Sequence, residues 1–149
     1  MNAHTAKQTL PLMISSALFV AAGGFVHFRE WFDTYRHLPG SVAGVAVVRV
    51  GFPIEGFVSA VVVGALVYCI ARRSRFTPLV IAGAIVFEAA ALATLIATRT
   101  GNVFGWSEHV WTLGANESRA VEIGALVALV AVAAVGALTW RPPVPAPSR

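Results

Sequence analysis

Long apolar runs, each bracketed by basic side chains, dominate the chain. They cover residues 8–28, 50–71, 76–98 and 120–140, and each contains 21–23 residues. A helix that rises about 1.5 Å per residue needs about 20 residues to cross the hydrocarbon of a bilayer. Membrane strands would be about half as long and would alternate in polarity. The pattern therefore predicts an all-α fold, an integral membrane bundle of four transmembrane helices.

The composition agrees with a lipid environment. Hydrophobic residues make up 57% of the 149 residues and charged residues only 12%, against about 25% charged residues in soluble domains. The length suits one domain, which we place at residues 1–141. Residues 142–149 are rich in proline, which cannot continue a helix, and are expected to form a short cytoplasmic tail. The expected partner is the lipid bilayer.

The basic residues predict the topology. Arg72, Arg73 and Arg75 lie between the second and third apolar runs without an acidic neighbour, and short Lys/Arg-rich loops mark the cytoplasmic side. The loops at the other side, about 29–49 and 99–119, mix arginine with acidic residues. Both termini are therefore expected in the cytoplasm, and the first run is expected to remain as a helix. The Arg- and Ala-rich usage suggests a bacterium, hence a multi-pass protein of the plasma (inner) membrane.

The net charge of +4 does not indicate a nucleic-acid-binding protein. The basic residues punctuate the apolar runs instead of forming a stripe with interleaved aromatic residues. The single cysteine, Cys69, excludes an internal disulfide and a cysteine-based metal site. Small residues are frequent along the apolar runs, and they allow helices to approach closely in lipid. Such faces would serve packing within the bundle, contact with a larger membrane protein, or a homo-oligomer.

Three glutamates interrupt the apolar runs and are the main pointers to a functional site. They are Glu55, Glu88 and Glu122. A carboxylate inside hydrocarbon costs about 2.5–3.5 kcal/mol on insertion scales. A chain keeps such a group when the group is paired with a cation, is protonated, or has a functional role.

Glu88 is the most extreme of the three. Counting from its flanking arginines places it at the membrane midplane, about 16 Å from either bracket. Because no cation in the other runs lies at that level, we expect a neutral carboxyl group that hydrogen-bonds to serine hydroxyls. The serines expected at that level are Ser59 and either Ser15 or Ser16. A packing role, a proton- or ligand-linked role and an intermolecular partner all remain open.

The other polar residues are expected nearer the outer surface. His27, Glu55 and Glu122 can converge at the outer mouth of an antiparallel bundle, with Arg49 and Arg119 at the same level. Arg119 and Glu122 are three residues apart and are predicted to pair directly. We therefore assign these residues, with Glu88, to a candidate ligand-binding cluster.

Local signals surround this mouth. Pro53 predicts a kink that frees a backbone carbonyl near Glu55. Asn116-Glu117-Ser118 is expected to cap the fourth helix at its start. The two outer loops are aromatic, and two interpretations are open. They form an interfacial belt at the level of the lipid headgroups, or they fold over the bundle as a lid.

Histidine with two carboxylates can bind zinc, iron or manganese, so His27, Glu55 and Glu122 are metal-ligand candidates. Their spacing matches no metal motif, because they lie on different helices. Structural ion pairs, and a pocket for a quinone, lipid or small molecule, are the alternatives. No nucleotide-binding glycine loop, HExxH or GxSxG motif is present. We assign no catalytic residue, expect no enzyme and leave the cofactor open.

Four features stand out along the outer half of the predicted bundle. They are His27, the stretch from Tyr35 to Pro39, Phe104-Gly105-Trp106 followed by Glu108, and Glu122 near the start of the last helix. In these features the chain resembles a group of small four-helix membrane proteins of actinobacteria. The resemblance implies an inner-membrane location and the four-span layout, and it implies no activity.

Two functions follow as predictions. The first is a non-enzymatic accessory subunit or ligand-binding module with a polar site at the outer mouth. The alternative is a metal- or proton-handling membrane protein, either a small transporter or a redox enzyme. In the alternative, His27, Glu55 and Glu122 form the site and Glu88 extends the path inward.

Overall fold

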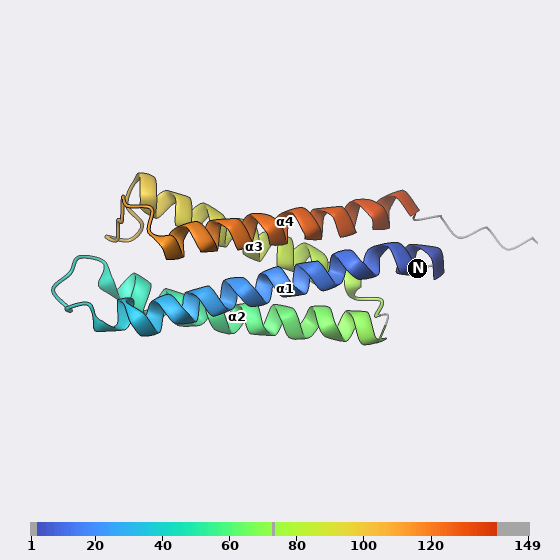
Figure 1. Ribbon diagram of the computed structural model, residues 1–149, viewed down its shortest axis with the longest axis horizontal. Coiled ribbons are helices and arrows are strands. Elements are labelled where there is room, and N and C mark those ends of the chain that lie inside the picture. Colours follow the sequence, from blue (N-terminus) through green and yellow to red (C-terminus); the bar gives the residue numbers. More distant parts are fainter. Residues whose placement is uncertain (1–2, 73, 140–149) are drawn as a thin grey trace, which may run out of the picture.

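The computed structural model describes residues 3–72 and 74–139, and within these ranges the chain is helical with no β-strand. Four long helices lie side by side (Figure 1). Their bounds are Ala3–Asp33 for α1, Val45–Arg72 for α2, Thr77–Thr100 for α3 and Leu113–Thr139 for α4, with a 3-10 turn, η1, at Tyr35–His37. The predicted all-α fold with four helices is confirmed. Arg73 and the proposed tail at 142–149 lie outside the described residues.

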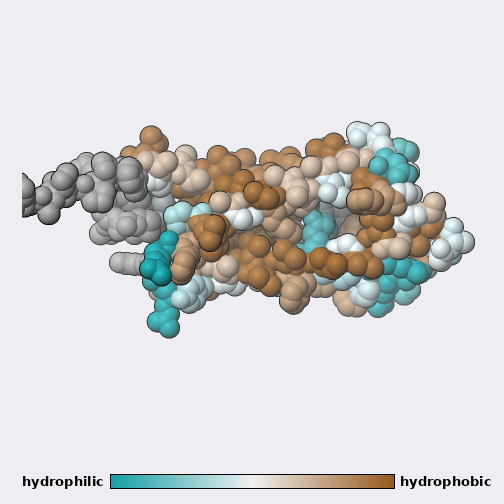
Figure 2. Space-filling view, turned by 180° about the vertical axis from the view of Figure 1, so that it is seen from behind, coloured by the Kyte–Doolittle hydropathy of each residue, from teal (hydrophilic) through white to brown (hydrophobic). Residues whose placement is uncertain are grey.

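All four helices are long and apolar enough to cross a membrane. Exposed large hydrophobic side chains occur on every one of them, and hydrophobic surface covers the middle of the molecule, with hydrophilic groups towards its two ends (Figure 2). A soluble protein would not leave so much apolar surface exposed. Insertion into a membrane and the direction of the termini stay predictions.

Three of the four helices, α1, α2 and α4, begin before the apolar runs that predicted them. The largest difference is in α4, which begins at Leu113 instead of residue 120. Asn116-Glu117-Ser118 therefore lies inside the helix, and its predicted capping role is wrong. The hydroxyl of Thr112 accepts the N–H of Ala115 at 3.2 Å and caps this end. The charged residues that flank an apolar run mark where polar side chains begin. The helix itself continues as long as its backbone hydrogen bonds can form.

Packing is uneven around the bundle. α1 packs extensively against both α2 and α4, α4 packs against α3, and the contact between α2 and α3 is thin. The close approach of α1 and α2 depends on glycine. A Cβ atom on Gly24 would lie 2.7 Å from the Cβ of Ser59, and one on Gly56 would lie 2.6 Å from the ring of Phe28. The seam between α2 and α3 is the loosest of these helix contacts.

The bundle has two apolar cores. We call the end that carries the α1–α2 and α3–α4 connections the loop end, and the end with the short α2–α3 connection the turn end. The larger core fills the turn half with ten buried side chains, including Val20, Leu66 and Leu129. The smaller core lies at the loop end around Tyr35 and Trp106.

The two connections at the loop end contact each other. Gly44 has a φ of +69°, and a Cβ atom there would lie 2.2 Å from the backbone nitrogen of Trp106, so only glycine fits. Glu108 accepts the hydroxyl of Tyr35 at 2.8 Å and pairs with Arg99 at 2.8 Å. The two connections therefore contact each other at this end of the bundle, and we call them together the lid.

Candidate metal centre

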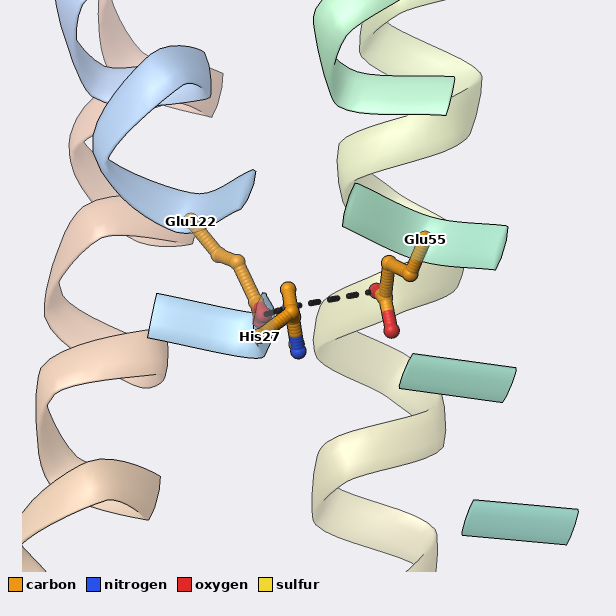
Figure 3. A group of neighbouring side chains, drawn as sticks. All are labelled: His27, Glu55 and Glu122. Atoms are coloured by element: carbon orange, nitrogen blue, oxygen red, sulfur yellow. Dashed lines mark ion pairs between the residues drawn. The ribbon is translucent and has the colours of Figure 1, made fainter. Parts of the chain in front are cut away.

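Side chains from three helices meet beneath this lid. His27 of α1 lies between Glu55 of α2 and Glu122 of α4 (Figure 3). Its Nε2 atom is 3.4 Å from Oε1 of Glu55 and 3.4 Å from Oε1 of Glu122. Because α1 packs against both partner helices, a side chain on its inner face reaches both carboxylates.

The three side chains differ in exposure. Glu122 is 2% exposed, His27 8% and Glu55 24%. Within the described part of the chain, neither carboxylate oxygen of Glu122 has a hydrogen-bond partner, and neither has Nδ1 of His27. Most buried polar atoms in proteins are hydrogen-bonded, so atoms without partners need an explanation. A bound ion is one such explanation.

The two distances are longer than strong hydrogen bonds and are compatible with a shared cation. Strong hydrogen bonds between ring nitrogen and carboxylate are about 2.7–2.9 Å long. Two ligands that each lie about 2.0–2.2 Å from a tetrahedral metal ion are roughly 3.4 Å apart. One ligand atom from each of His27, Glu55 and Glu122 lies within 4.8 Å of the others. Two carboxylates and a neutral imidazole would also balance the charge of a divalent cation.

Aromatic rings and a small cavity surround the cluster. The ring of Phe52 meets His27 edge-on with centroids 5.2 Å apart, and Tyr35 packs on Phe52 at 4.4 Å. A cavity of about 90 Å³ borders His27 and Glu55 and extends under Trp106. Since each water occupies about 30 Å³ in the liquid, this space has room for water. A water molecule there can supply a fourth metal ligand, and another can accept the Nδ1–H of His27.

The two predicted arginines do not join the cluster. Arg49 donates to the backbone carbonyl of Leu38. Arg119 donates to the side chain of Asn116 at 3.0 Å and lies 4.5 Å from the centre of the Trp111 ring. The predicted pair between Arg119 and Glu122 is therefore wrong. Arg119 stays at the exposed end of α4, where ring and amide partners are available without desolvation, while Glu122 points into the bundle.

Glu88 is buried in α3, with 4% of its surface exposed. Among the described residues, no ion pair or hydrogen bond joins it to a serine. The hydroxyl of Ser16, one of the expected donors, instead donates to the carbonyl of Leu12 one turn earlier in its own helix, at 2.8 Å. This local bond satisfies Ser16 without another helix. The neutral state of Glu88 stays a prediction.

Some groups that organise the site were not predicted. Pro53 has no N–H to donate, so the carbonyl of Arg49 four residues earlier loses its helical partner. The indole N–H of Trp31 donates to that carbonyl at 2.8 Å. The carbonyl near Glu55 therefore lacks its helical hydrogen bond, as expected, and a side chain from α1 donates to it instead. The sequence signal was a proline inside an apolar run, but nothing in the sequence identified the donor.

Two arginines near the cluster are paired with other acidic residues. Arg29 forms ion pairs with Glu30, at 3.1 Å, and with Glu117. Arg99 donates to both the side chain and the backbone carbonyl of Glu108. Each arginine at this end thus has a partner of its own, and no arginine or lysine forms a described ion pair with Glu55 or Glu122.

Comparison of the chain with protein-family models, curated proteins and solved structures finds no match. The function must therefore be argued from the site itself.

Proposed function

We propose that the chain is a small integral membrane protein that binds a divalent transition-metal cation. The ligands are His27, Glu55 and Glu122, and the cations that suit one imidazole and two carboxylates are Zn²⁺, Mn²⁺ and Fe²⁺. The observation that carries the proposal is the pair of 3.4 Å separations around Nε2 of His27, next to carboxylate oxygens without hydrogen-bond partners. Of the two predicted functions, this geometry favours the metal-handling one.

The location of the cluster supports the same proposal. It is enclosed by three helices and covered by the joined loops, yet Glu55 borders a cavity. Three protein ligands with one open position are typical of sites where the metal exchanges or acts on a ligand. In a plasma membrane with both termini in the cytoplasm, the loop end would face outward and receive the metal from that side. The accessory-subunit role stays a prediction.

The test is metal binding by the purified full-length chain. After treatment with a chelator, titration with Zn²⁺ and with Mn²⁺, followed by calorimetry and elemental analysis, should give one tightly bound ion per chain. Glu122→Gln removes one anionic ligand, and His27→Ala removes the central one. Each variant should weaken binding about 100-fold or more.

Matched variants separate a lost ligand from a general effect. Glu117→Gln changes the same residue type on the same helix but outside the cluster, and His37→Ala removes an exposed histidine. Both should bind metal as the wild type does. Substoichiometric binding by the wild type, or equal binding by Glu122→Gln and Glu117→Gln, would rule out the proposed centre.

A further inference from the structure

A second cavity opens between α2 and α3, along the loosest helix contact. It has a volume of about 250 Å³, and six of its eight lining residues are apolar or small. The two polar residues are Glu55 and Thr94. Figure 2, which views the molecule from the side on which α3 lies, shows a hydrophilic patch in a hollow of the hydrophobic surface. We call this cavity the α2–α3 cleft.

Glu55 connects this cleft to the candidate metal centre. It lines both the cleft and the smaller cavity under the lid. Its side chain is 24% exposed, whereas that of Glu122, on the other side of His27, is 2% exposed. A molecule in the cleft can therefore reach one carboxylate of the cluster and not the other.

Access to the cleft is lateral. Ile54, which lines it, is 56% exposed, and its neighbours Val50 and Phe57 are 56% and 66% exposed. In a membrane these side chains would face lipid. A molecule that enters here must therefore be dissolved in the bilayer, and most of it must be apolar.

The chemistry of the cleft restricts its occupant further. An ionised carboxylate only accepts hydrogen bonds, so the polar head must donate, and a hydroxyl does so without bringing a second charge into the hydrocarbon. The carboxylate would repel an anionic phosphate head. Ligand pockets for drug-sized molecules are about 300–1,000 Å³. A space of about 250 Å³ suits a small head and the first part of one chain, but not a two-chain lipid.

We propose that the α2–α3 cleft binds a single-chain lipid alcohol, whose hydroxyl group donates to Glu55 while its chain lies between the two helices. The hydroxyl of Thr94 lies in the same cleft as a second polar contact. The proposal requires no metal, because the carboxylate of Glu55 accepts the hydrogen bond whether or not it also binds a cation.

The test uses a photoreactive long-chain alcohol in phosphatidylcholine vesicles that contain the full-length protein. Its methyl ether serves as the matched probe, because the ether has the same chain but cannot donate. The alcohol should label peptides of α2 and α3 about tenfold more than the ether, since hydrogen bonds to charged groups are typically strong enough for that ratio. Labelling should persist in the presence of a chelator.

Two glycines of α2 provide the control. Gly51 lines the cleft and Gly64 does not, and a Cβ atom would meet nothing within 4 Å at either position. Gly51→Leu should reduce labelling by the alcohol tenfold or more because it fills the cleft, while Gly64→Leu should leave labelling unchanged. Glu55→Leu should also abolish the preference for the alcohol, whereas Glu55→Gln, which keeps an acceptor oxygen, should retain part of it.

The proposal fails if the ether labels as strongly as the alcohol, since the cleft would then hold an ordinary acyl chain. It also fails if Gly51→Leu is labelled like Gly64→Leu. Because the labelling is measured in chelator, its result is independent of the metal titration. A protein that binds no metal but passes this test would lose the proposed metal function and keep the lipid site.

Discussion

The two halves of the bundle use buried space in opposite ways. The turn half encloses a continuous apolar core in which Leu66 and Leu129 are fully buried. The loop half has a smaller apolar core and also encloses His27, Glu55 and Glu122, with polar atoms that lack hydrogen bonds and a cavity beside them. An apolar core gains from every contact, whereas buried carboxylate oxygens that lack hydrogen bonds are costly. If the cluster binds a cation as proposed, the turn half mainly maintains the fold, and the loop half gives up some stability for the site.

The largest effect should come from the turn half. Leu129→Ala removes a side chain with no exposed surface, and it should lower the free energy of unfolding by about 2–5 kcal/mol through lost contacts and a cavity. Thermal unfolding in detergent would measure this. Metal affinity should stay within about twofold of the wild type. A large loss of metal affinity would show that the two halves are not separable in this way.

A substitution in the cluster of the loop half should change stability in the opposite direction. Glu122→Leu replaces a buried carboxylate that has no described hydrogen-bond partner with an apolar side chain of similar size. In chelator it should leave stability unchanged or raise it, because a buried carboxylate without hydrogen bonds is costly and His27 keeps Glu55 as a partner, while metal binding is lost. Destabilisation in the metal-free state would show that Glu122 contributes to folding and would remove the contrast between the halves.

The smallest effect should come from the bond that spans α1 and α2. Trp31→Phe keeps an aromatic ring but leaves the carbonyl of Arg49, already without its helical partner because of Pro53, with no donor. The loss should be about 1–2 kcal/mol of unfolding free energy. Trp111→Phe, at a more exposed ring, is the control and should change stability by less than about 0.5 kcal/mol. Equal effects would mean that the indole bond is not specific.

The architecture could be predicted from the sequence because bilayer thickness dictates helix length. The four apolar runs gave the number of helices, although α4 starts seven residues before the expected residue 120. Local polar signals were less reliable. Asn116 was expected to cap α4, but Thr112 does so, because the hydrogen bonds of the backbone continue past a change in hydropathy.

The sequence predicted which three residues meet in the candidate site, but not which partners the neighbouring polar residues have. Depth along the apolar runs brought His27, Glu55 and Glu122 to one level, and the structure brings them together. Depth says nothing about rotation around a helix axis or about competing partners. The sequence therefore could not show that Arg119 does not pair with Glu122, or that Ser16 does not donate to Glu88. It also could not identify Trp31 as the donor to the Arg49 carbonyl, because Trp31 lies on another helix. Metal binding by the cluster stays a proposal.

The contact between Gly44 and Trp106 also has a mechanical consequence. At the loop end, the chain joins α1 to α2 and α3 to α4, and the two connections also touch. At the turn end, only the α2–α3 connection joins neighbouring helices. α2 and α3 are thus held together at both ends, by the touching connections at the loop end and by the chain itself at the turn end. Because their contact is thin, α2 and α3 can separate most easily between the two tied ends, along the cleft that Glu55 lines.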